Sequence, residues 1–411
     1  MKNKLFYIIL LLAIVILIPL YYFLRPKVTE IKLNAVPFSN LPGWPHSNLL
    51  TSFSTFQTSC KVFLKSDPDK SVGSEFIDLK ARDWLPACQA AMALQKPYTN
   101  EQIRDFFQTW FNVVEFHDGK PVKGLFTGYY MSALKGSLTK TKHFHVPIYG
   151  LPDDLISINL GLFDPELKNK KIVGRVVDKH RLIPYHTRAE IDRGALKGKA
   201  PVLVWVDSEI DRLFLEIQGS GVIELPDGSP MYIGYSAQNG APYTAIAGVL
   251  IKQGVMTRDN ASMQRIRQYL EAHPKEIRPV LHHNKSFVFF EKARSSDAFG
   301  SQGTVLTPGY SMAVDLKWVP MGTPVWLDTT RPELRTKHSR PFRRLMIAQD
   351  TGGAIRGPVR GDVYWGAGDR ATSIAGRMKN PGVYWMLLPK KPQAEAPITQ
   401  PNAQTDLLHA G

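Results

Sequence analysis

The apolar pattern along the chain is strongest at its start, where residues 5–24 carry no charge between flanking lysines and arginine. At about 1.5 Å per helical residue this run spans about 30 Å, the thickness of a bilayer's hydrocarbon core. A cleaved signal peptide is the alternative, but the run is longer than the apolar part of such peptides and no small-x-small cleavage site follows. The pattern favours an uncleaved anchor over residues 1–28, with residues 29–54 as a tether. Both alternatives place the rest of the chain outside the cytoplasm.

Helical spacing of apolar residues returns in three later segments. In residues 99–112, Thr99 and Gln102 form a capping-box pattern, and apolar side chains follow at i, i+3, i+4 and i+7. The same spacing recurs in residues 243–254 and 262–273. These segments predict amphipathic helices that pack on a core.

Short β-rich runs separated by Gly, Pro and charged turns fill much of the remaining chain. The runs predicted as strands are KGLFTGYYM, VPIYG, PVLVWV and RLFLEIQGSG within residues 123–223, then SFVFFE, TPVWL, RLMIA and VYWMLL. Residues 391–411 are rich in Pro, Gln and Ala and predict a disordered tail. The pattern as a whole indicates a mainly β protein with some helices, with its strands in a barrel or sandwich.

Length and charge narrow the class of protein. The 411 residues suffice for two or more domains, and the net charge of +15 indicates attraction to nucleic acid, a membrane surface or an acidic polymer such as cell wall. No basic run is interleaved with stacking aromatics, which argues against nucleic acid as a partner.

Cys60 and Cys88 are the two cysteines of the chain. An even count in a chain that enters an oxidising compartment favours a disulfide. Two free buried thiols remain an alternative. A metal pair is disfavoured because no third ligand has a recognised spacing to them.

The familiar signatures of metal, serine and nucleotide chemistry do not occur. Eleven histidines include no HExxH motif, and the chain has neither GxSxG nor GxxxxGK[ST]. We therefore predict no metal and no cofactor, which leaves carboxylates as the candidate chemistry.

Residues 348–371 read AQDTGGAIRGPVRGDVYWGAGDRA, with three aspartates among six glycines. Asp350 lies in Asp-Thr-Gly-Gly, but an aspartic protease needs a second Asp-Thr-Gly, and the chain has none. Taken alone, Asp350 suits a turn that accepts backbone N–H bonds. Asp362 precedes an aromatic pair that can shield it from water, raise its pKa and make it a general acid. A solvated loop aspartate is the alternative.

The segment resembles the three-aspartate (3D) region of the membrane-bound lytic murein transglycosylase A family. Further blocks that look like the family follow one another in order: FTGYY at 126–130, PYHTRAEID at 184–192, FLEIQGSG at 214–221, GYSAQNGAPYTAIA at 234–247, NKSFVFFE at 284–291 and AVDLKWVPMGTP at 313–324. Together they cover most of residues 55–390.

The resemblance implies an enzyme that cuts the β-1,4 bond between N-acetylmuramic acid and N-acetylglucosamine and leaves a 1,6-anhydro-muramyl end. The sugar's own 6-hydroxyl would be the nucleophile, so one carboxyl can serve first as acid and then as base. Two alternatives remain. A hydrolytic glycosidase would use Asp350 or Asp369 to activate water, and a wall-binding protein would keep the groove without turnover.

The resemblance also implies roles for single residues. Asp362 maps onto the catalytic aspartate, Asp350 onto supporting hydrogen bonds, and Asp315 onto the barrel's structure or the rim of the groove. The residues implied in substrate binding are Thr127, Tyr129, Tyr130, Gln218, Gly219, Ser220, Asn239, Gly352 and Gly353. Core packing is the alternative for Tyr130, because adjacent strand residues face opposite sides.

The implied fold is a double-psi β-barrel from residues 55–130 and 241–390, with a smaller β-barrel inserted at 131–240 and a groove between them. Well-known members carry an acylated cysteine after the signal peptide, and this chain has none before Cys60. We therefore expect the anchor to hold it at the periplasmic face of the inner membrane, with the outer membrane as the alternative. The expected partners are glycan strands, the membrane and members of a wall-synthesis complex.

Overall fold

The computed structural model describes residues 31–391 apart from 168, 169, 259, 294, 335 and 337. The predicted anchor at 1–28 and all but the first residue of the predicted tail lie outside the described residues. Within the described part of the chain, no helix combines the length and the apolar character that crossing a membrane requires.

Six strands hydrogen-bond in a closed circuit in the first lobe (residues 31–130 and 298–391), and the end of one of them continues into the second lobe. They are β3 (Gly124–Ser137), β15 (Arg360–Ala367), β12 (Ser311–Val314), β14 (Ser339–Thr351), β13 (Pro324–Pro332) and β16 (Lys379–Pro389). β15 is parallel to β3 and β12 is parallel to β14, while the other four pairings are antiparallel. A sheet that closes on itself is the arrangement of a barrel. The double-psi connectivity stays a prediction.

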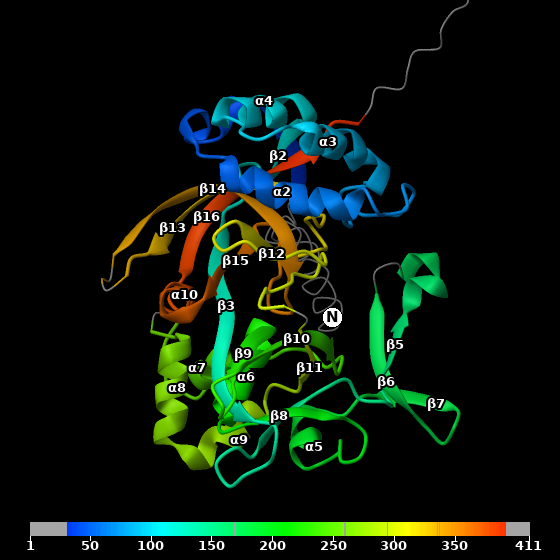
Figure 1. Cartoon of the computed structure of the whole chain (residues 1–411), viewed down its shortest axis with the longest axis vertical. Coiled ribbons are helices and arrows are strands. Elements are labelled where there is room, and N and C mark those ends of the chain that lie inside the picture. The colour runs from blue at the N-terminus through cyan, green and yellow to red at the C-terminus, as the bar shows by residue number, and fades with distance from the viewer. Residues whose placement is uncertain are drawn as a thin grey trace, which may run out of the picture.

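Helices cover one end of this sheet (Figure 1). They are α2 (Leu50–Phe63), α3 (Ala81–Ala93) and α4 (Asn100–Trp110), with β1 (Lys32–Val36), β2 (Phe111–His117), η1 (Phe38–Asn40) and η2 (Trp44–His46) beside them. α4 begins at the predicted capping box, where the Thr99 hydroxyl accepts the Gln102 N–H at 3.2 Å. Rings from all three helices and the barrel form one aromatic core.

The predicted tether differs from the structure. Its described residues include β1, which pairs with β2, and Trp44, which is 1% exposed and packs edge-on against Trp326 of the barrel. The prolines and polar residues of this segment gave no periodic pattern from which its buried apolar residues could be predicted. Residues 31–54 therefore belong to the first lobe.

The second lobe (residues 131–292) continues the sheet and adds its own helices. Its elements are β4 (Val146–Tyr149), α5 (Arg188–Asp192), β8 (Val202–Val206), α6 (Glu209–Gln218), β9 (Ser220–Glu224), β10 (Pro230–Gln238), α7 (Ile246–Lys252), α8 (Met263–Ala272), η5 (Pro274–Glu276), α9 (Ile277–Leu281) and β11 (Val288–Lys292). β11 pairs with β10, and α7 to α9 share a core with α6. The predicted boundary at residue 240 therefore falls inside this lobe, because helical segments after it pack on α6.

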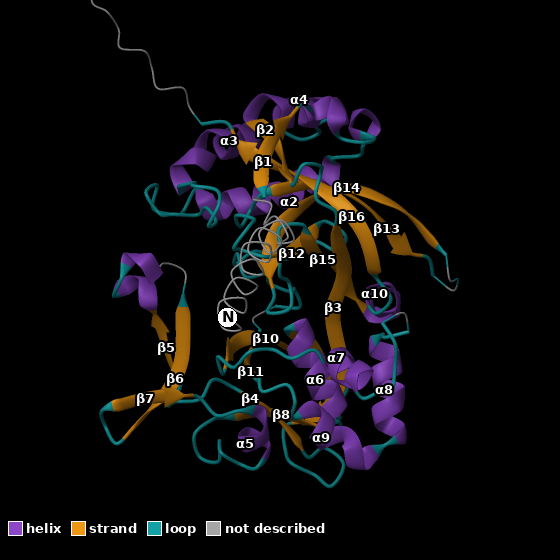
Figure 2. Ribbon diagram, turned by 180° about the vertical axis from the view of Figure 1, so that it is seen from behind, coloured by secondary structure: helices purple, strands orange, loops and turns teal. Residues whose placement is uncertain are grey.

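A small arm projects from the second lobe (Figures 1 and 2). It consists of β5 (Ile156–Asn159), β6 (Lys171–Val177) and β7 (Arg181–Pro184), with η3 (Leu160–Leu162) and η4 (Pro165–Leu167) at one end. Its three strands pair only with one another in the strand order of the described residues.

One predicted strand is a helix. The run RLFLEIQGSG was predicted as β, but its first seven residues lie in α6. Ser208 caps the N-terminus by accepting the Asp211 N–H, and Gly219 ends the helix with φ +78°. Buried residues at Ile210, Leu213 and Phe214 show the helical period that β-rich composition obscured.

Candidate active site

A groove of about 1990 Å³ lies between the two lobes. The first lobe contributes Tyr129, Asp350 and Asp362, and the second lobe contributes Gln218 and Tyr243. Residues far apart in the sequence meet here because β3 and β15 are neighbours in the sheet.

Asp362 lies on β15 directly opposite Thr127 of β3. The Thr127 hydroxyl donates to its Oδ1 at 2.6 Å. Burial raises the pKa of Asp362, and the charge of Asp350 adds to this effect, while Arg360 and the Thr127 hydrogen bond oppose it. A carboxyl of this kind holds a proton more readily than a solvated aspartate, as a general acid requires.

Asp350, at the end of β14, is held by four donors. Its Oδ2 accepts the Tyr129 hydroxyl at 2.8 Å. Its Oδ1 accepts the backbone N–H of Thr351 at 2.9 Å, and the N–H and hydroxyl of Ser301 at 2.9 and 2.7 Å. Burial raises the pKa of Tyr129 well above its usual value, and Asp350 raises it further, so the phenol stays a donor.

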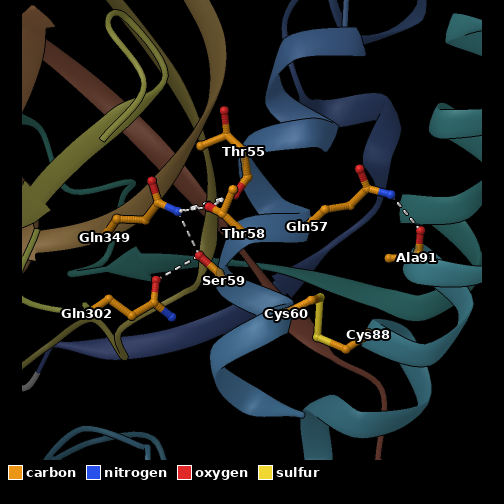
Figure 3. Close-up of a disulfide and its surroundings, with 9 residues drawn as sticks. All are labelled: Thr55, Gln57, Thr58, Ser59, Cys60, Cys88, Ala91, Gln302 and Gln349. Atoms are coloured by element: carbon orange, nitrogen blue, oxygen red, sulfur yellow. Dashed lines mark hydrogen bonds between the residues drawn. A yellow bond between two sulfur atoms is a disulfide. The ribbon is translucent and has the colours of Figure 1, made fainter. Parts of the chain in front are cut away.

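A polar network under this site joins it to α2 (Figure 3). The Gln349 amide donates to the hydroxyls of Thr58 and Ser59 at 2.8 and 2.9 Å, and Ser59 donates to Gln302 at 2.7 Å. Gln349 and Gln302 directly adjoin Asp350 and Ser301 in the chain. α2 therefore supports the Asp350 side of the groove from behind. The sequence reading missed this network, although the Ser/Thr-rich helix TSFSTFQTSC was a signal for it.

The Cys60–Cys88 disulfide is present in the structure and links α2 to α3. It lies one residue from Ser59 (Figure 3). Among the described residues, no group of His, Cys, Asp or Glu is arranged to hold a metal ion.

Asp315 follows β12 and is 4% exposed. Its Oδ2 accepts the Gly357 N–H at 2.8 Å and its Oδ1 accepts the Lys317 N–H at 3.2 Å, with Arg356 at 3.5 Å. These contacts tie two loops of the groove wall together, which suits the structural role expected for it.

Gly352 and Gly353 line the groove where the lobes approach each other. A Cβ on Gly353 would lie 4.0 Å from Cβ of Tyr243 in the second lobe, and one on Gly352 would lie 3.2 Å from Ile355. Larger side chains here would fill the groove.

The other residues predicted to bind substrate differ in whether they line the groove. Gln218, Gly219 and Ser220 line the groove, whereas Thr127 and Tyr130 do not. Thr127 contacts Asp362 instead, and Tyr130 is the strand neighbour that faces away from Tyr129. The Gln218 side chain accepts the Tyr130 N–H at 2.9 Å, which ties α6 to β3.

Asn239 is 2% exposed and does not line the groove. Its amide donates to the carbonyls of His186 and Lys285 and accepts the Phe287 N–H at 2.9 Å. Its hydrogen-bonding atoms already serve the backbone, so the structure does not support the predicted substrate contact.

Comparisons with known proteins give the same assignment for both parts of the chain. Residues 125–291 match the MltA specific insert domain and residues 310–388 match the 3D domain. A crystal structure of membrane-bound lytic murein transglycosylase from Agrobacterium tumefaciens has a TM-score of 0.76 at 30% identity, covering 87% of this chain and 98% of that one. The chain belongs to the membrane-bound lytic murein transglycosylase A family.

Two further relatives of the family come from Escherichia coli. Membrane-bound lytic murein transglycosylase A of strain K12 is 33% identical over 265 residues, which are 64% of this chain and 65% of the relative's length. A crystal structure of E. coli MltA with bound chitohexaose has a TM-score of 0.60 at 25% identity, covering 90% of this chain and 96% of that one. The insert-domain match ends at residue 291, beside the end of the second lobe at Lys292.

Three of the family blocks meet in a buried ion network that the sequence reading missed. Arg188 lies 1% exposed, pairs with Glu216 and donates to the carbonyls of Asn284 and Ser286. The blocks PYHTRAEID, FLEIQGSG and NKSFVFFE supply these residues. Arg188 and Glu216 are far apart in the sequence, so no local motif predicts that they form an ion pair.

The network continues from Glu216 to a second arginine. Arg212 lies 3.6 Å from Glu216 and 2.6 Å from Asp192, and Asp192 also accepts from His282 at 3.0 Å. Burial alone would raise the pKa of Asp192, but Arg212, Arg188 and His282 hold it below its usual value. This network fixes the second-lobe wall of the groove, because Glu216 and Asn284 are among the lining residues.

Proposed function

We propose that this chain is a lytic transglycosylase that cleaves peptidoglycan between N-acetylmuramic acid and N-acetylglucosamine, with Asp362 as its acid and base. The single observation that carries this proposal is Asp362 itself, a partly buried carboxyl of raised pKa that lines the groove between the two lobes. The chitohexaose-bound relative supports a β-linked amino-sugar polymer as the ligand class.

The reaction needs no water. Asp362 donates its proton to the glycosidic oxygen, and the bond from that oxygen to C1 of the muramic acid breaks. The 6-hydroxyl oxygen of the same sugar then bonds to C1 and returns its proton to the Asp362 carboxylate. The products are a free 4-hydroxyl on N-acetylglucosamine and a 1,6-anhydro ring, and the aspartate regains its starting form.

A hydrolytic glycosidase would need a second carboxylate to activate water. Asp350 does not suit this role, because both of its oxygens are occupied by protein donors. Asp369 lies exposed in the first turn of α10 (Gly368–Ala375) and does not line the groove. Neither of the two aspartates expected for a hydrolytic mechanism is therefore placed to activate water, which favours the intramolecular nucleophile.

In this proposal the protein works in the cell envelope as a membrane-associated enzyme, as the relatives' names suggest. The apolar segment at residues 5–24 would anchor it, with the inner membrane favoured over the outer membrane. Glycan strands are its substrate, and wall-synthesis proteins are candidate partners. Its net positive charge suits the carboxylates of peptide stems, so wall binding should weaken as salt is raised.

Mass spectrometry of the products tests the proposal. Residues 28–411 and the Asp362→Asn variant are each incubated with purified peptidoglycan. Muropeptides lighter by one water than hydrolysed ones, released only by the unsubstituted protein, are expected. Ordinary reducing ends would overturn the mechanism in favour of hydrolysis. Binding without release of any muropeptide would establish a wall-binding protein.

A further inference from the structure

We propose that Arg360 is a positioning residue that acts on Asp362 through the Thr127 hydroxyl, so that Oδ1 of Asp362 accepts a fixed hydrogen bond and Oδ2 carries the proton that is transferred. The inference rests on the proposed function, because it assigns a task to each oxygen of the proposed acid. It adds a residue, Arg360, that the sequence reading did not single out.

The three residues meet on one face of two paired strands. Arg360 and Asp362 are two positions apart on β15, so they face the same side, and Thr127 lies opposite Asp362 on β3. The Arg360 Nη2 donates to Thr127 Oγ1 at 2.9 Å, and Thr127 Oγ1 lies 2.6 Å from Asp362 Oδ1. Arg360 Nη1 donates to the Leu125 carbonyl at 3.2 Å, which holds the guanidinium against β3.

The chemistry of the donors fixes the direction of this relay. A guanidinium has N–H donors and no acceptor, so the Thr127 oxygen must accept from Arg360. The single hydroxyl hydrogen of Thr127 is then free to point to Asp362 Oδ1. With Oδ1 occupied as an acceptor, the acidic proton belongs on Oδ2, and Oδ2 receives no hydrogen bond from the described residues. This leaves Oδ2 to face the substrate.

Arg360 also tempers the effect of burial on the carboxyl. Its positive charge and the Thr127 hydrogen bond both stabilise the carboxylate that forms once the proton has left. Burial lowers the pKa of Arg360 and Asp362 opposes that change, and an arginine stays protonated in proteins. The pair therefore supports the second half of the reaction, in which Asp362 acts as a base.

The other groups around Asp362 do not duplicate this role. Tyr129 donates to Asp350 and burial raises the pKa of Tyr364 to about 12, so both phenols stay neutral. Asp350 is the acidic neighbour, and it raises the pKa of Asp362. Lys379 of β16 pairs with Thr127 along the backbone but donates its ammonium to the Arg258 carbonyl at 2.9 Å.

The test uses variants that separate charge from hydrogen bonding. Arg360→Gln removes the positive charge. Arg360→Lys keeps the charge but lacks the planar guanidinium, whose two terminal nitrogens donate to Leu125 and Thr127. Thr127→Val removes the hydroxyl, and Thr127→Ser keeps it. Arg340→Gln is the matched control, because Arg340 is an exposed arginine on the same sheet, in β14.

Two readouts are measured for each variant. The first is the pH profile of kcat and kcat/KM for muropeptide release. The second is the titration of the Asp362 carboxyl by carbon NMR of protein with labelled aspartate, assigned from the signal lost in Asp362→Asn. The titration does not depend on turnover, so it tests the relay even where activity is absent.

We expect Arg360→Gln and Thr127→Val each to move the Asp362 titration and the basic limb of kcat/KM up by about one pH unit or more. We also expect kcat to fall by about tenfold while KM changes by less than about twofold. Thr127→Ser should recover most of kcat, Arg360→Lys should keep the titration near its original position, and Arg340→Gln should match the unsubstituted protein.

The double variant Arg360→Gln/Thr127→Val distinguishes a relay from two separate effects. Its loss of kcat should stay close to the larger of the two single losses, because both changes break the same connection. Losses that multiply, or an Arg360→Gln titration equal to that of the unsubstituted protein, would overturn the proposal. Should Arg360→Gln not fold, the contrast between Thr127→Val and Thr127→Ser decides it.

The two proposals can fail separately. If the unsubstituted protein releases no muropeptides, the proposed function fails, and a shifted titration in Arg360→Gln still supports the positioning role. If muropeptides are released but the titration does not move, the positioning role fails alone.

Discussion

Two regions of the molecule withdraw carboxyl groups from solvent to different extents and pair them with different partners. In the second lobe, the carboxyl groups of Glu216 and Asp192 are almost fully shielded from solvent. Glu216 pairs with Arg188, and Asp192 pairs with Arg212. In the groove, Asp362 receives one hydroxyl hydrogen bond from Thr127 and no direct salt bridge among the described residues. A carboxyl that is fully paired holds structure, and one that is incompletely paired can exchange a proton.

The directions of the pKa changes express the same contrast. Burial favours the protonated form in both places, but around Asp192 the arginines outweigh it and the pKa is lowered. Around Asp362 burial and the charge of Asp350 outweigh Arg360, and the pKa is raised. The cations around each carboxyl therefore decide in which direction its pKa moves.

The largest expected effect is on activity, from Asp362→Asn. A general acid contributes about 10²–10⁴-fold, and an amide cannot donate a transferable proton, so muropeptide release should fall by at least about 100-fold. Liquid chromatography of released muropeptides measures this loss, and circular dichroism controls for the fold. Activity within about tenfold of the original would remove Asp362 from the proposed role.

The same variant has a signature in stability. The pKa of Asp362 is higher in the folded than in the unfolded chain, so its contribution to stability is present at low pH and is lost as pH rises through the folded value. Asp362→Asn should therefore be at least as stable as the original protein at pH 7, and this advantage should vanish below about pH 4. Thermal melts at both pH values test the sign, and a lower melting temperature of the variant at pH 7 would contradict it.

In the second lobe, Arg188→Met should lower the free energy of unfolding by about 3–5 kcal/mol, because it leaves the Glu216 carboxylate buried without its main partner. Urea denaturation measures this change. The double variant Arg188→Met/Glu216→Leu is the control and should recover part of the loss. An Arg188→Met protein as stable as the original would show that Arg212 alone compensates the glutamate.

The Cys60→Ala/Cys88→Ala variant tests whether the support behind the groove is needed for chemistry. The bond joins residues 28 apart, so its loss should lower the free energy of unfolding by about 3–4 kcal/mol in the chain-entropy model. Activity measured well below the melting temperature should change by less than about twofold, because β3 and β15 position Asp362 without α2. A large loss of kcat in folded protein would show that α2 controls the site through Gln349 and Gln302.

Asp350→Asn has a smaller expected effect on the free-energy scale, with a loss of about tenfold in kcat, or about 1.4 kcal/mol. Removing this negative charge lowers the pKa of Asp362, so the basic limb of the pH profile should move to lower pH. The direction is opposite to that expected for Arg360→Gln, which makes the two variants a matched pair. A loss larger than that of Asp362→Asn would exchange the roles of the two aspartates.

Much of the fold could be predicted from local patterns. The capping box at Thr99 and the spacing after it predicted α4, and mainly β structure with some helices was predicted from the β-rich runs. α6 was missed because its buried face consists of residues that also suit strands. The extent of the second lobe was missed because helices 246–281 can pack on either side of a boundary, and only their contacts with α6 decide it.

The site residues with a local sequence pattern could likewise be predicted, and those that depend on contacts between distant segments could not. Asp362 stood out because a carboxyl beside aromatic residues has a local signature, and the resemblance then added Tyr129 and Gln218. Arg360 was missed because the hydroxyl to which it donates, that of Thr127, is 233 positions away. The network around Arg188 was missed because its salt bridges join residues that are remote in sequence. Asn239 was misjudged because a conspicuous block does not reveal whether its amide faces ligand or backbone.

The closed strand circuit has a consequence for how the chain folds as it is made. Thr127 and Asp362, which hydrogen-bond to each other, are 235 positions apart, and the whole second lobe is synthesised between them. Strand β3 cannot pair with β15 until almost the entire chain has been synthesised, while the second lobe, whose contacts are more local, can form first. The hydrogen bond between Thr127 and Asp362 is thus among the last contacts to be completed, so the wall of the groove that carries Asp362 forms only when the chain is nearly finished.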